Sequence, residues 1–423
     1  MAYPISLADA LTHPARGRAS LSIGRDPLPV PLRRDAAMSV LDITEWFGET
    51  SGGIRTYLMQ KAQYVAAHPE LRHVVTVPGE RDSVSDEQGV RMYRLRGPRI
   101  PRQRPYRFML ATRSVSRIVQ HERPDLIEIG SPFVVPWIVR HATAAMHVPL
   151  VCFYHTNLPR MFSTGVRGVA RTRRAISQAA WHYMRTLDRL FQVTIVSSAY
   201  SARELAAEGI TRIAMVPLGV EVKRFRPLRR AHSADTRARF GLPEGPLAGF
   251  VGRFAREKEL GTVLDAWRAI EQRTGARLVL IGAGPLEAAL RAHPYGPRVL
   301  FVPFQSDRNV LADLMAALDV YVAPGPMETF GLAALEALSS GTPVLSVNDG
   351  GVAELVKGSG AGRLYVAGNV ESLVDEAVTL FGGDLESIGR AGRDFAKAEH
   401  SWDRVFDRLF AVYGDVLAAH RAR

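Results

Sequence analysis

The stretch Gly325-Pro-Met-Glu328-Thr-Phe-Gly331-Leu-Ala-Ala-Leu-Glu336-Ala-Leu-Ser-Ser-Gly341-Thr-Pro343-Val follows an apolar run that ends near Ala323. The run predicts a buried strand, and the alanine- and leucine-rich residues after Gly331 predict a helix that begins there. A helix start offers unpaired backbone N–H groups and the positive end of the helix dipole, which together favour a phosphate. This strand–turn–helix unit therefore predicts both a parallel sheet and an anion site.

Two glutamates in this stretch, Glu328 and Glu336, are eight residues apart. Within one helix they would be separated by roughly 12 Å along the axis and about 80° around it. A retaining glycosidase needs two carboxyl groups about 5 Å apart, so a hydrolase pair does not fit. The two carboxylates suit the two ends of one extended ligand, because each accepts hydrogen bonds from hydroxyl groups. The alternative is one glutamate at a helix start and one solvated surface glutamate.

A second strand-to-helix turn lies upstream, at Val251-Gly252-Arg253-Phe-Ala-Arg-Glu-Lys258. Arg253 and Lys258 follow the end of a predicted buried strand. They are placed to converge on a diphosphate, whose charge otherwise needs a metal ion. Basic residues after strands are common, so this turn alone indicates little.

Strands and helices alternate along the rest of the chain in two successive runs, which predicts an α/β protein with two doubly wound, Rossmann-like parallel sheets facing across a cleft. We expect a loosely ordered extension over 1–37, an N-terminal domain over 38–220 and a C-terminal domain over 221–401. The amphipathic segment 402–423 is expected to dock as a helix that completes the N-terminal domain. Ligands of such sheets bind beyond the carboxyl ends of the strands, so the cleft is the expected site. The expected strands are 39–44, 73–77, 126–129, 150–154, 193–196, 213–216, 247–251, 278–281, 299–302, 320–322 and 343–347, and the expected helices lie near 54–67, 108–121, 171–191, 199–208, 259–273, 285–292, 308–317, 331–340 and 370–381.

Basic residues are concentrated in the N-terminal half. Residues 1–220 contain 29 lysines and arginines against 17 aspartates and glutamates, whereas residues 221–423 contain 25 of each. Residues 129–187 contain seven arginines and no carboxylate. This asymmetry indicates an anionic partner of the N-terminal half, such as a membrane surface, a phosphorylated acceptor or nucleic acid. A general preference for arginine is the alternative, since only five of the 54 basic residues are lysine, but it does not explain the neutral C-terminal half.

The single cysteine, Cys152, excludes an internal disulfide framework and a multi-cysteine zinc site. No stretch reaches the about 20 mostly apolar residues of a membrane span. The N-terminus lacks a basic start followed by an apolar core, so we expect no secretion signal.

Together the motifs resemble those of family 4 of the glycosyltransferases, which are retaining enzymes of the two-domain GT-B fold. The resemblance covers about residues 38–420. The elements that carry it occur in the family's order and are Ser51-Gly52-Gly53-Ile54, Pro124-Asp125-Leu126-Ile127, Tyr154-His155-Thr156, Val196-Ser-Ser198 with Val216-Pro-Leu-Gly219-Val, Gly252-Arg253 with Lys258, Ile281-Gly-Ala-Gly284-Pro-Leu, and the pair Glu328 and Glu336.

The resemblance implies a nucleotide-sugar donor site in residues 221–401. Arg253 and Lys258 would clamp the diphosphate. Glu328 would contact the hydroxyls of the donor sugar, and Glu336 would bind the ribose. Backbone N–H groups for the phosphates or the sugar would come from the start of the following helix, at Phe330, Gly331 and Leu332.

On the N-terminal side, the resemblance implies that Gly52 and Gly53 let the backbone approach the diphosphate and the acceptor without a side chain. His155, at the end of a strand, matches the active-site histidine of the family, although a lone histidine is more often structural. The acceptor-side candidates near it are Tyr154, Asn157 and Arg160.

Enzymes of this kind are thought to react on one face of the sugar, with the leaving phosphate assisting deprotonation of the acceptor. Catalysis then rests on leaving-group stabilisation and positioning, and no protein nucleophile is required. The chain has no Asp-x-Asp metal motif. We therefore expect no cofactor and no metal, with arginine and lysine in place of a cation.

The residues around His155 and over 325–331 resemble those of members that make glycolipids, including mannosyl-lipid enzymes. We predict transfer of a hexose from GDP-mannose, or from UDP-glucose as the alternative donor, to a lipid-linked or membrane-proximal acceptor. The protein would be cytoplasmic and peripheral on the inner face of the membrane. The other interpretations are a transferase with a soluble phosphorylated sugar acceptor and a basic nucleic-acid-binding protein, although no recognised nucleic-acid module is found.

Overall fold

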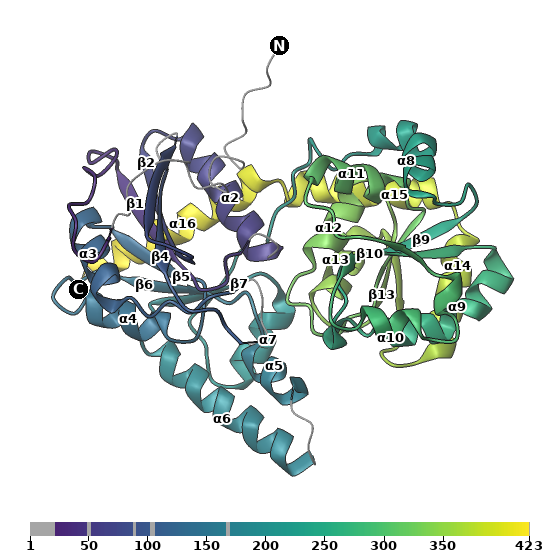
Figure 1. The fold of residues 1–423 in the computed structure, drawn as a ribbon, viewed down its shortest axis with the longest axis horizontal. Coiled ribbons are helices and arrows are strands. Elements are labelled where there is room, and N and C mark those ends of the chain that lie inside the picture. Colours follow the sequence, from purple (N-terminus) through teal and green to yellow (C-terminus); the bar gives the residue numbers. More distant parts are fainter. Residues whose placement is uncertain (1–21, 49–51, 88–89, 102–105, 166–169, 423) are drawn as a thin grey trace. The chain divides into compact units, whose positions relative to one another are not determined.

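The computed structural model describes residues 22–48, 52–87, 90–101, 106–165 and 170–422, which form two compact units (Figure 1). Unit 1 contains the described residues up to Val196, Glu204–Val216 and the segment from Phe406 onward. Unit 2 contains Ser197–Arg203 and Pro217–Val405. The sequence predicts boundaries at 220/221 and 401/402, whereas the chain passes between the units after Val216 and after Val405, and enters unit 2 briefly at 197–203.

Unit 1 is built on a sheet of eight strands in the order β3-β4-β2-β1-β5-β6-β7-β8. Neighbouring strands are parallel except for the antiparallel pair β3 and β4. The central strands are short, apolar and buried, as expected for a parallel sheet covered by helices on both faces. The strands are β1 (Met38–Ile43), β2 (Leu71–Gly79), β3 (Ser83–Glu87), β4 (Val90–Arg96), β5 (Leu126–Ile129), β6 (Leu150–Phe153), β7 (Val193–Val196) and β8 (Ile213–Met215).

Helices flank this sheet, and the C-terminal helix α16 returns to it from unit 2 (Figure 1). The helix α7 begins in unit 2 and ends in unit 1. The helices are α2 (Gly53–Ala67), α3 (Thr112–Glu122), α4 (Val135–Ala142), α5 (Leu158–Gly165), α6 (Ala170–Asp188), α7 (Ala199–Ala207) and α16 (Trp402–Arg421).

Residues 22–37 differ from the loosely ordered extension that the sequence predicts. Ile23 is fully buried, and Arg117 donates hydrogen bonds to the carbonyls of Ile23 and Asp26. Arg91 likewise binds the carbonyls of Pro29 and Val30. Arginines of unit 1 therefore anchor this segment through its backbone, which composition does not reveal. The rest of the predicted extension, 1–21, lies outside the described residues.

A buried polar network joins α2 and α16 to the sheet. Lys61 of α2 is fully buried, and its ammonium group lies 2.8 Å from Asp42 and 3.5 Å from Glu128. It also donates a 2.7 Å hydrogen bond to the hydroxyl of Tyr413 on α16, which in turn is bonded to Glu128. Burial raises the pKa of Glu128 to about 7, although Lys61 opposes this rise. The network fixes α2, and hence the chain that enters it at Gly53.

Unit 2 contains a fully parallel sheet of six strands in the order β11-β10-β9-β12-β13-β14. Trp267 lies at the centre of its core, fully buried, and its indole N–H donates to the carbonyl of Ala276. The strands are β9 (Leu247–Arg253), β10 (Arg277–Ala283), β11 (Leu300–Val302), β12 (Val320–Ala323), β13 (Val344–Val347) and β14 (Gly362–Tyr365). The helices are η1 (Pro227–His232), α8 (Ser233–Phe240), η2 (Arg256–Lys258), α9 (Leu260–Thr274), α10 (Glu287–Arg291), η3 (Gly296–Arg298), α11 (Arg308–Ala317), α12 (Leu332–Ser339), α13 (Gly351–Ser359), α14 (Val370–Phe381) and α15 (Leu385–Glu399).

Candidate active site

Three of the residues that the sequence predicts for the donor site lie in unit 2 where β9 and β12 end. Arg253 is the last residue of β9, Lys258 ends η2, and Glu328 lies in the turn after β12. The ammonium group of Lys258 is ion-paired with Glu328, and both side chains are partly exposed, at 21% and 30%. Arg253 is exposed, and its side chain has no ion-pair partner among the described residues. The structure thus brings two cations and one carboxylate to the carboxyl edge of the sheet, where ligands of such folds bind.

The turn between β12 and α12 has a backbone conformation that needs glycine. Gly331 has φ 96°, and a Cβ there would lie 2.2 Å from Cγ2 of Val352. The carbonyl of Glu328 accepts a 2.7 Å hydrogen bond from the N–H of Gly351, which fixes the turn against α13. No side chain caps the start of α12 at Leu332, so its N-terminus offers backbone N–H groups, as the sequence predicts.

Phe330, the residue before Gly331, is buried, at 3% exposure. The preceding carbonyl, that of Thr329, accepts a 2.6 Å hydrogen bond from the hydroxyl of Ser198. The hydroxyl of the neighbouring Ser197 also donates to the carbonyl of Thr329, at 3.3 Å. The serines of the Val196-Ser-Ser198 motif therefore hold the donor-side turn, a role that the sequence does not assign to them.

Glu336 lies on α12 and is 5% exposed. One of its oxygens, Oε1, lies 2.8 Å from the guanidinium of Arg308 at the start of α11. Burial raises the pKa of Glu336, and Arg308 opposes that rise. The hydroxyl of Tyr321 on β12 is close enough to both Glu328 and Glu336 for their charges to add to the effect of burial in raising its pKa. Both glutamates of the motif therefore act electrostatically on the same hydroxyl of unit 2.

His155 lies in unit 1, just after β6. Its ring stacks on Phe153 with 4.2 Å between centroids and meets the ring of Tyr57 edge-on at 5.3 Å. The hydroxyl of Tyr57 is held by Glu128 at 2.9 Å, so the buried network beneath α2 also supports the imidazole. Burial lowers the pKa of His155 to about 3. A neutral imidazole offers one hydrogen-bond donor and one acceptor, which suits sugar hydroxyls better than proton donation as a cation.

The glycine pair opens α2. Gly52 is the N-cap residue and Gly53 the first helical residue, while Ser51 lies outside the described residues. Among the described residues, no atom lies within 4 Å of a Cβ placed on Gly52, and its φ of −74° is open to any residue. Packing therefore does not explain glycine at this position.

The acceptor-side candidates have partners within unit 1. Asn157 accepts a hydrogen bond from the N–H of Arg160, which caps α5, and donates a 2.6 Å bond to Glu204. Arg160 lies 3.0 Å from the same carboxylate. Tyr154 is buried, and its N–H donates to the carbonyl of Ile195. Their role at an acceptor remains a prediction.

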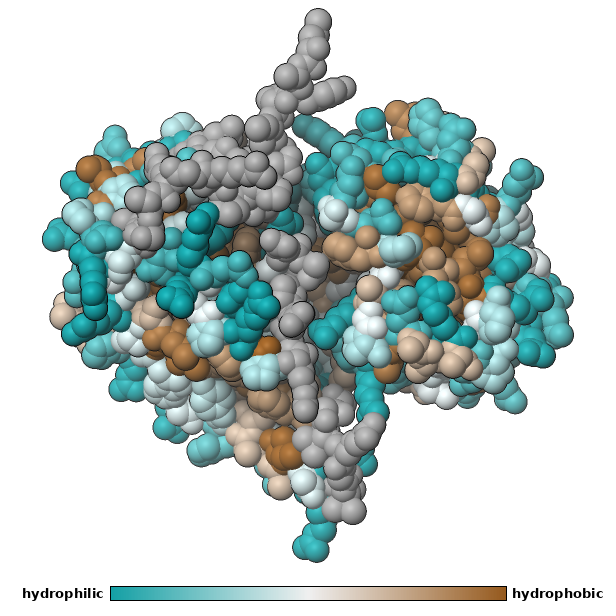
Figure 2. All heavy atoms as spheres, viewed as in Figure 1, coloured by the Kyte–Doolittle hydropathy of each residue, from teal (hydrophilic) through white to brown (hydrophobic). Residues whose placement is uncertain are grey.

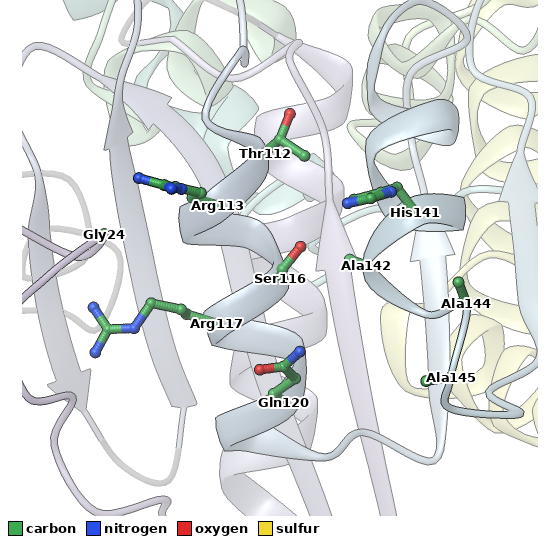
Figure 3. A pocket seen from close by; sticks show the side chains of 10 residues that line it. All are labelled: Gly24, Thr112, Arg113, Ser116, Arg117, Gln120, His141, Ala142, Ala144 and Ala145. Carbon is green, nitrogen blue, oxygen red and sulfur yellow. The ribbon is translucent and has the colours of Figure 1, made fainter.

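A separate hollow of about 500 Å³ lies between α3 and α4 (Figure 3). None of the predicted site residues lines it, and Arg117 in its wall is bonded to the backbone of the N-terminal segment. Nowhere in the described part of the chain, including this hollow, are three or more histidine, cysteine, aspartate or glutamate side chains grouped so that they could hold a metal ion.

Comparisons with known proteins agree with this arrangement. Residues 51–224 match the model described as Glycosyltransferase Family 4, and residues 245–382 match Glycosyl transferases group 1. The chain is 32% identical to a GDP-mannose-dependent alpha-(1-6)-phosphatidylinositol dimannoside mannosyltransferase of Mycobacterium tuberculosis, over 91% of this chain and 98% of that protein. It is 30% identical to a GDP-mannose-dependent alpha-mannosyltransferase of the same species, over 80% of this chain and 85% of that one.

Among solved structures, sucrose-phosphate synthase from Thermosynechococcus elongatus superposes with a TM-score of 0.74 at 22% identity, covering 90% of this chain and all of that one. An Anabaena protein solved with UDP and glucose, HepE, gives a TM-score of 0.66 at 17% identity, covering 89% and 99%. These likenesses confirm the predicted GT-B fold of two Rossmann-like units. The chain is a glycosyltransferase and belongs to family 4.

Proposed function

We propose that this protein is a retaining, metal-independent mannosyltransferase that transfers mannose from GDP-mannose to a lipid-linked acceptor at a membrane surface. The observation that carries the proposal is the 32% identity over 91% of the chain to a relative named for GDP-mannose and for phosphatidylinositol dimannoside. The carboxyl edge of the sheet in unit 2 supports it, because Arg253 ends β9 and Glu328 follows β12 there.

Each of the donor residues contacts a different part of the nucleotide sugar. Arg253 and Lys258 neutralise the diphosphate as it becomes the leaving group, which is the main electrostatic demand of the reaction. The N-terminus of α12 adds the N–H groups of residues 331 and 332. Glu328 exchanges its ion pair with Lys258 for hydroxyls of the sugar, and Glu336 binds the ribose.

In unit 1, Gly52 and Gly53 admit the ligand close to the backbone, consistent with the open space around Gly52. The neutral imidazole of His155 binds a sugar hydroxyl. In the transfer, the bond between C1 and the phosphate oxygen breaks, and a bond from the acceptor oxygen to C1 forms on the same face. The acceptor proton passes to the leaving phosphate, so the products are the glycoside and GDP.

A basic surface on α6 supports a membrane-proximal acceptor. Arg171, Arg173 and Arg174 are exposed at its first turn and have no ion-pair partner in the parts of the chain that the structure describes. In Figure 2 the lowest tip of the view is hydrophilic, and apolar side chains lie just above it. Each arginine near an anionic bilayer contributes about 1 kcal/mol to binding. Within the described residues, no helix combines the length and apolarity of a membrane span, and we propose peripheral attachment to the cytoplasmic face.

The test offers two donors and two acceptors. Purified protein is incubated with GDP-mannose or UDP-glucose, together with anionic vesicles that contain phosphatidylinositol dimannoside or with soluble inositol phosphate, and products are identified by mass spectrometry. We expect GDP release and a mannosylated lipid. Turnover of UDP-glucose alone would overturn the donor, and transfer only to inositol phosphate would overturn the lipid acceptor. The configuration at C1, read by NMR, tests retention.

A further inference from the structure

Arg308 occupies an unfavourable place in its own helix. It is the first residue of α11, where the positive end of the helix dipole disfavours a cation. The preceding residue, Asp307, supplies the helix cap by accepting a 2.7 Å hydrogen bond from the N–H of Asn309. Local helix preferences therefore explain Asp307 but not Arg308, whose position must come from its tertiary partners.

Those partners are two carboxylates from distant parts of unit 2. The guanidinium lies 2.8 Å from Oε1 of Glu336 and donates to Glu221 at 2.9 and 3.2 Å. It also lies over the ring of Phe225, 5.0 Å from its centroid. A planar guanidinium fits two carboxylates and an aromatic face at once, which an ammonium group does not.

The charges around Glu336 balance. Glu221 is also paired with Arg224, at 2.7 Å, so the cluster contains two carboxylates and two guanidinium groups. The charge of Glu336 also acts on the hydroxyl of Tyr321 on β12, where it adds to the effects of burial and of Glu328 in raising the pKa of that hydroxyl. Burial raises the pKa of Glu336, so without Arg308 this carboxylate would have both burial and Glu221 against its charge.

The carboxylate of Glu336 is held at one oxygen. Arg308 binds Oε1, and among the described residues no hydrogen bond or ion pair reaches Oε2. An ionised carboxylate only accepts hydrogen bonds, so in a fixed orientation it can accept from the hydroxyls of a cis-diol such as the ribose of a nucleotide. Arg308, which is also bound to Glu221, favours the ionised form of Glu336 and fixes its orientation.

We propose that Arg308 is a positioning residue that keeps Glu336 ionised and oriented for the ribose hydroxyls, and thereby sets discrimination between ribose and 2′-deoxyribose nucleotides. This inference rests on the proposed role of Glu336 in the donor site. It does not depend on mannose or on the acceptor, so it is tested by nucleotide binding alone.

The experiment compares GDP and UDP with their 2′-deoxy forms by calorimetry, in the wild type, Arg308→Gln, Arg308→Lys and the surface control Arg268→Gln. In the wild type and in Arg268→Gln, loss of the 2′-hydroxyl is expected to weaken binding about tenfold or more, as for a hydrogen bond to a charged group. In Arg308→Gln this ratio should fall to near one, and Arg308→Lys should restore it in part. The ratio is insensitive to a loss of folded protein, and circular dichroism verifies the fold.

A second readout is pH. In Arg308→Gln, ribonucleotide affinity should rise with increasing pH as Glu336 regains its charge, because burial raises the pKa of this carboxyl and Arg308 no longer opposes the rise, whereas the wild type should change less. If the ratio of ribonucleotide to 2′-deoxyribonucleotide affinity stays at the wild-type value in Arg308→Gln, the inference is overturned. Arg308 would then only stabilise the packing of α11. Failure of the proposed function would look different, with nucleotides bound but no GDP-mannose turned over.

Discussion

Glu328 and Glu336 are both ion-paired, but their surroundings differ at the scale of the residue. The Lys258–Glu328 pair is partly exposed, so solvent screens it and it contributes at most about 1 kcal/mol. Glu336 is 5% exposed, and its pairing with Arg308 offsets its loss of hydration. We therefore expect the Lys258–Glu328 pair to separate more easily than the Arg308–Glu336 pair when a ligand binds.

The Glu328→Gln variant should lower kcat/KM by about 10- to 100-fold, because a hydrogen bond from a hydroxyl to a charged acceptor contributes about 1.5–3 kcal/mol. The melting temperature should change little, since the exposed pair adds little stability. Glu257→Gln, an exposed change nearby in the same edge, serves as the matched control. Steady-state rates near wild type in Glu328→Gln would remove this residue from the donor site.

The imidazole of His155 should stay neutral from pH 5 to pH 8. Burial disfavours its charged form and lowers its pKa to about 3, so protonation in the folded state lies below this range. Below about pH 6.5 the imidazole of the unfolded chain takes up a proton that the folded chain does not. The free energy of unfolding therefore decreases as the solution is acidified from about pH 6.5. Histidine side-chain NMR, with the spectrum of His155→Ala for assignment, measures the titration, and a resonance with a midpoint near 6.5 would contradict it.

At the scale of the element, the start of α12 depends on its neighbours. Its N-cap, Gly331, has a positive φ, and α13 approaches so closely that Val352 fills the place of a side chain. The same turn is bound from the other side by Ser198. The N–H groups of α12 are thus presented by three segments together, and by none of them alone.

The Gly331→Ala variant should destabilise unit 2 by about 1–3 kcal/mol through its backbone conformation and should also weaken GDP binding. Adding Val352→Ala removes the 2.2 Å contact but not the positive φ, so recovery should be partial. The control is Gly261→Ala on α9, where a Cβ meets no atom within 4 Å and a helix gains about 0.5–1 kcal/mol. Thermal unfolding measures the stability and calorimetry measures GDP binding. Full recovery of both in the double variant would show that the contact with Val352, and not the positive φ, is the reason for glycine at position 331.

At the scale of the whole molecule, part of the positive charge of the N-terminal half is neutralised by ion pairs within unit 1. Arg91 and Arg72 are buried against Glu122, and Arg99 and Arg107 pair with Glu80. The arginines at the start of α6 remain exposed. The anionic partner that the sequence predicts is therefore best sought at α6 and not along the whole of unit 1.

Replacing Arg171, Arg173 and Arg174 together with glutamine should weaken binding to vesicles rich in anionic lipid. Three arginines at about 1 kcal/mol each correspond to about 100-fold in affinity at low salt. The matched control replaces three exposed arginines of unit 2, which are Arg239, Arg268 and Arg404. Flotation with vesicles measures binding, and equal retention of both triple variants would show that α6 does not bind the membrane.

Much of the fold could be predicted from the sequence, because buried parallel strands are short apolar runs and the donor motif marks a strand end. The antiparallel edge formed by β3 and β4 was missed, since Ser83–Glu87 is polar and pairs at the margin of the sheet. Arg308 was missed for another reason. It lies on a different helix from Glu336, and only the tertiary fold brings them together.

The return of the chain through α16 has a consequence for engineering. Residues 217–405 form an internal cassette, because unit 1 is completed by the residues from Phe406 onward. A chain that ended at Val216 would leave Lys61 without Tyr413 and would uncover the ring of Tyr64, which stacks on Phe410 at 5.5 Å. Because unit 2 also includes Ser197–Arg203, chimeras that exchange this unit within the family must splice at both ends of the cassette and match that segment as well, and simple truncation would not yield either half intact.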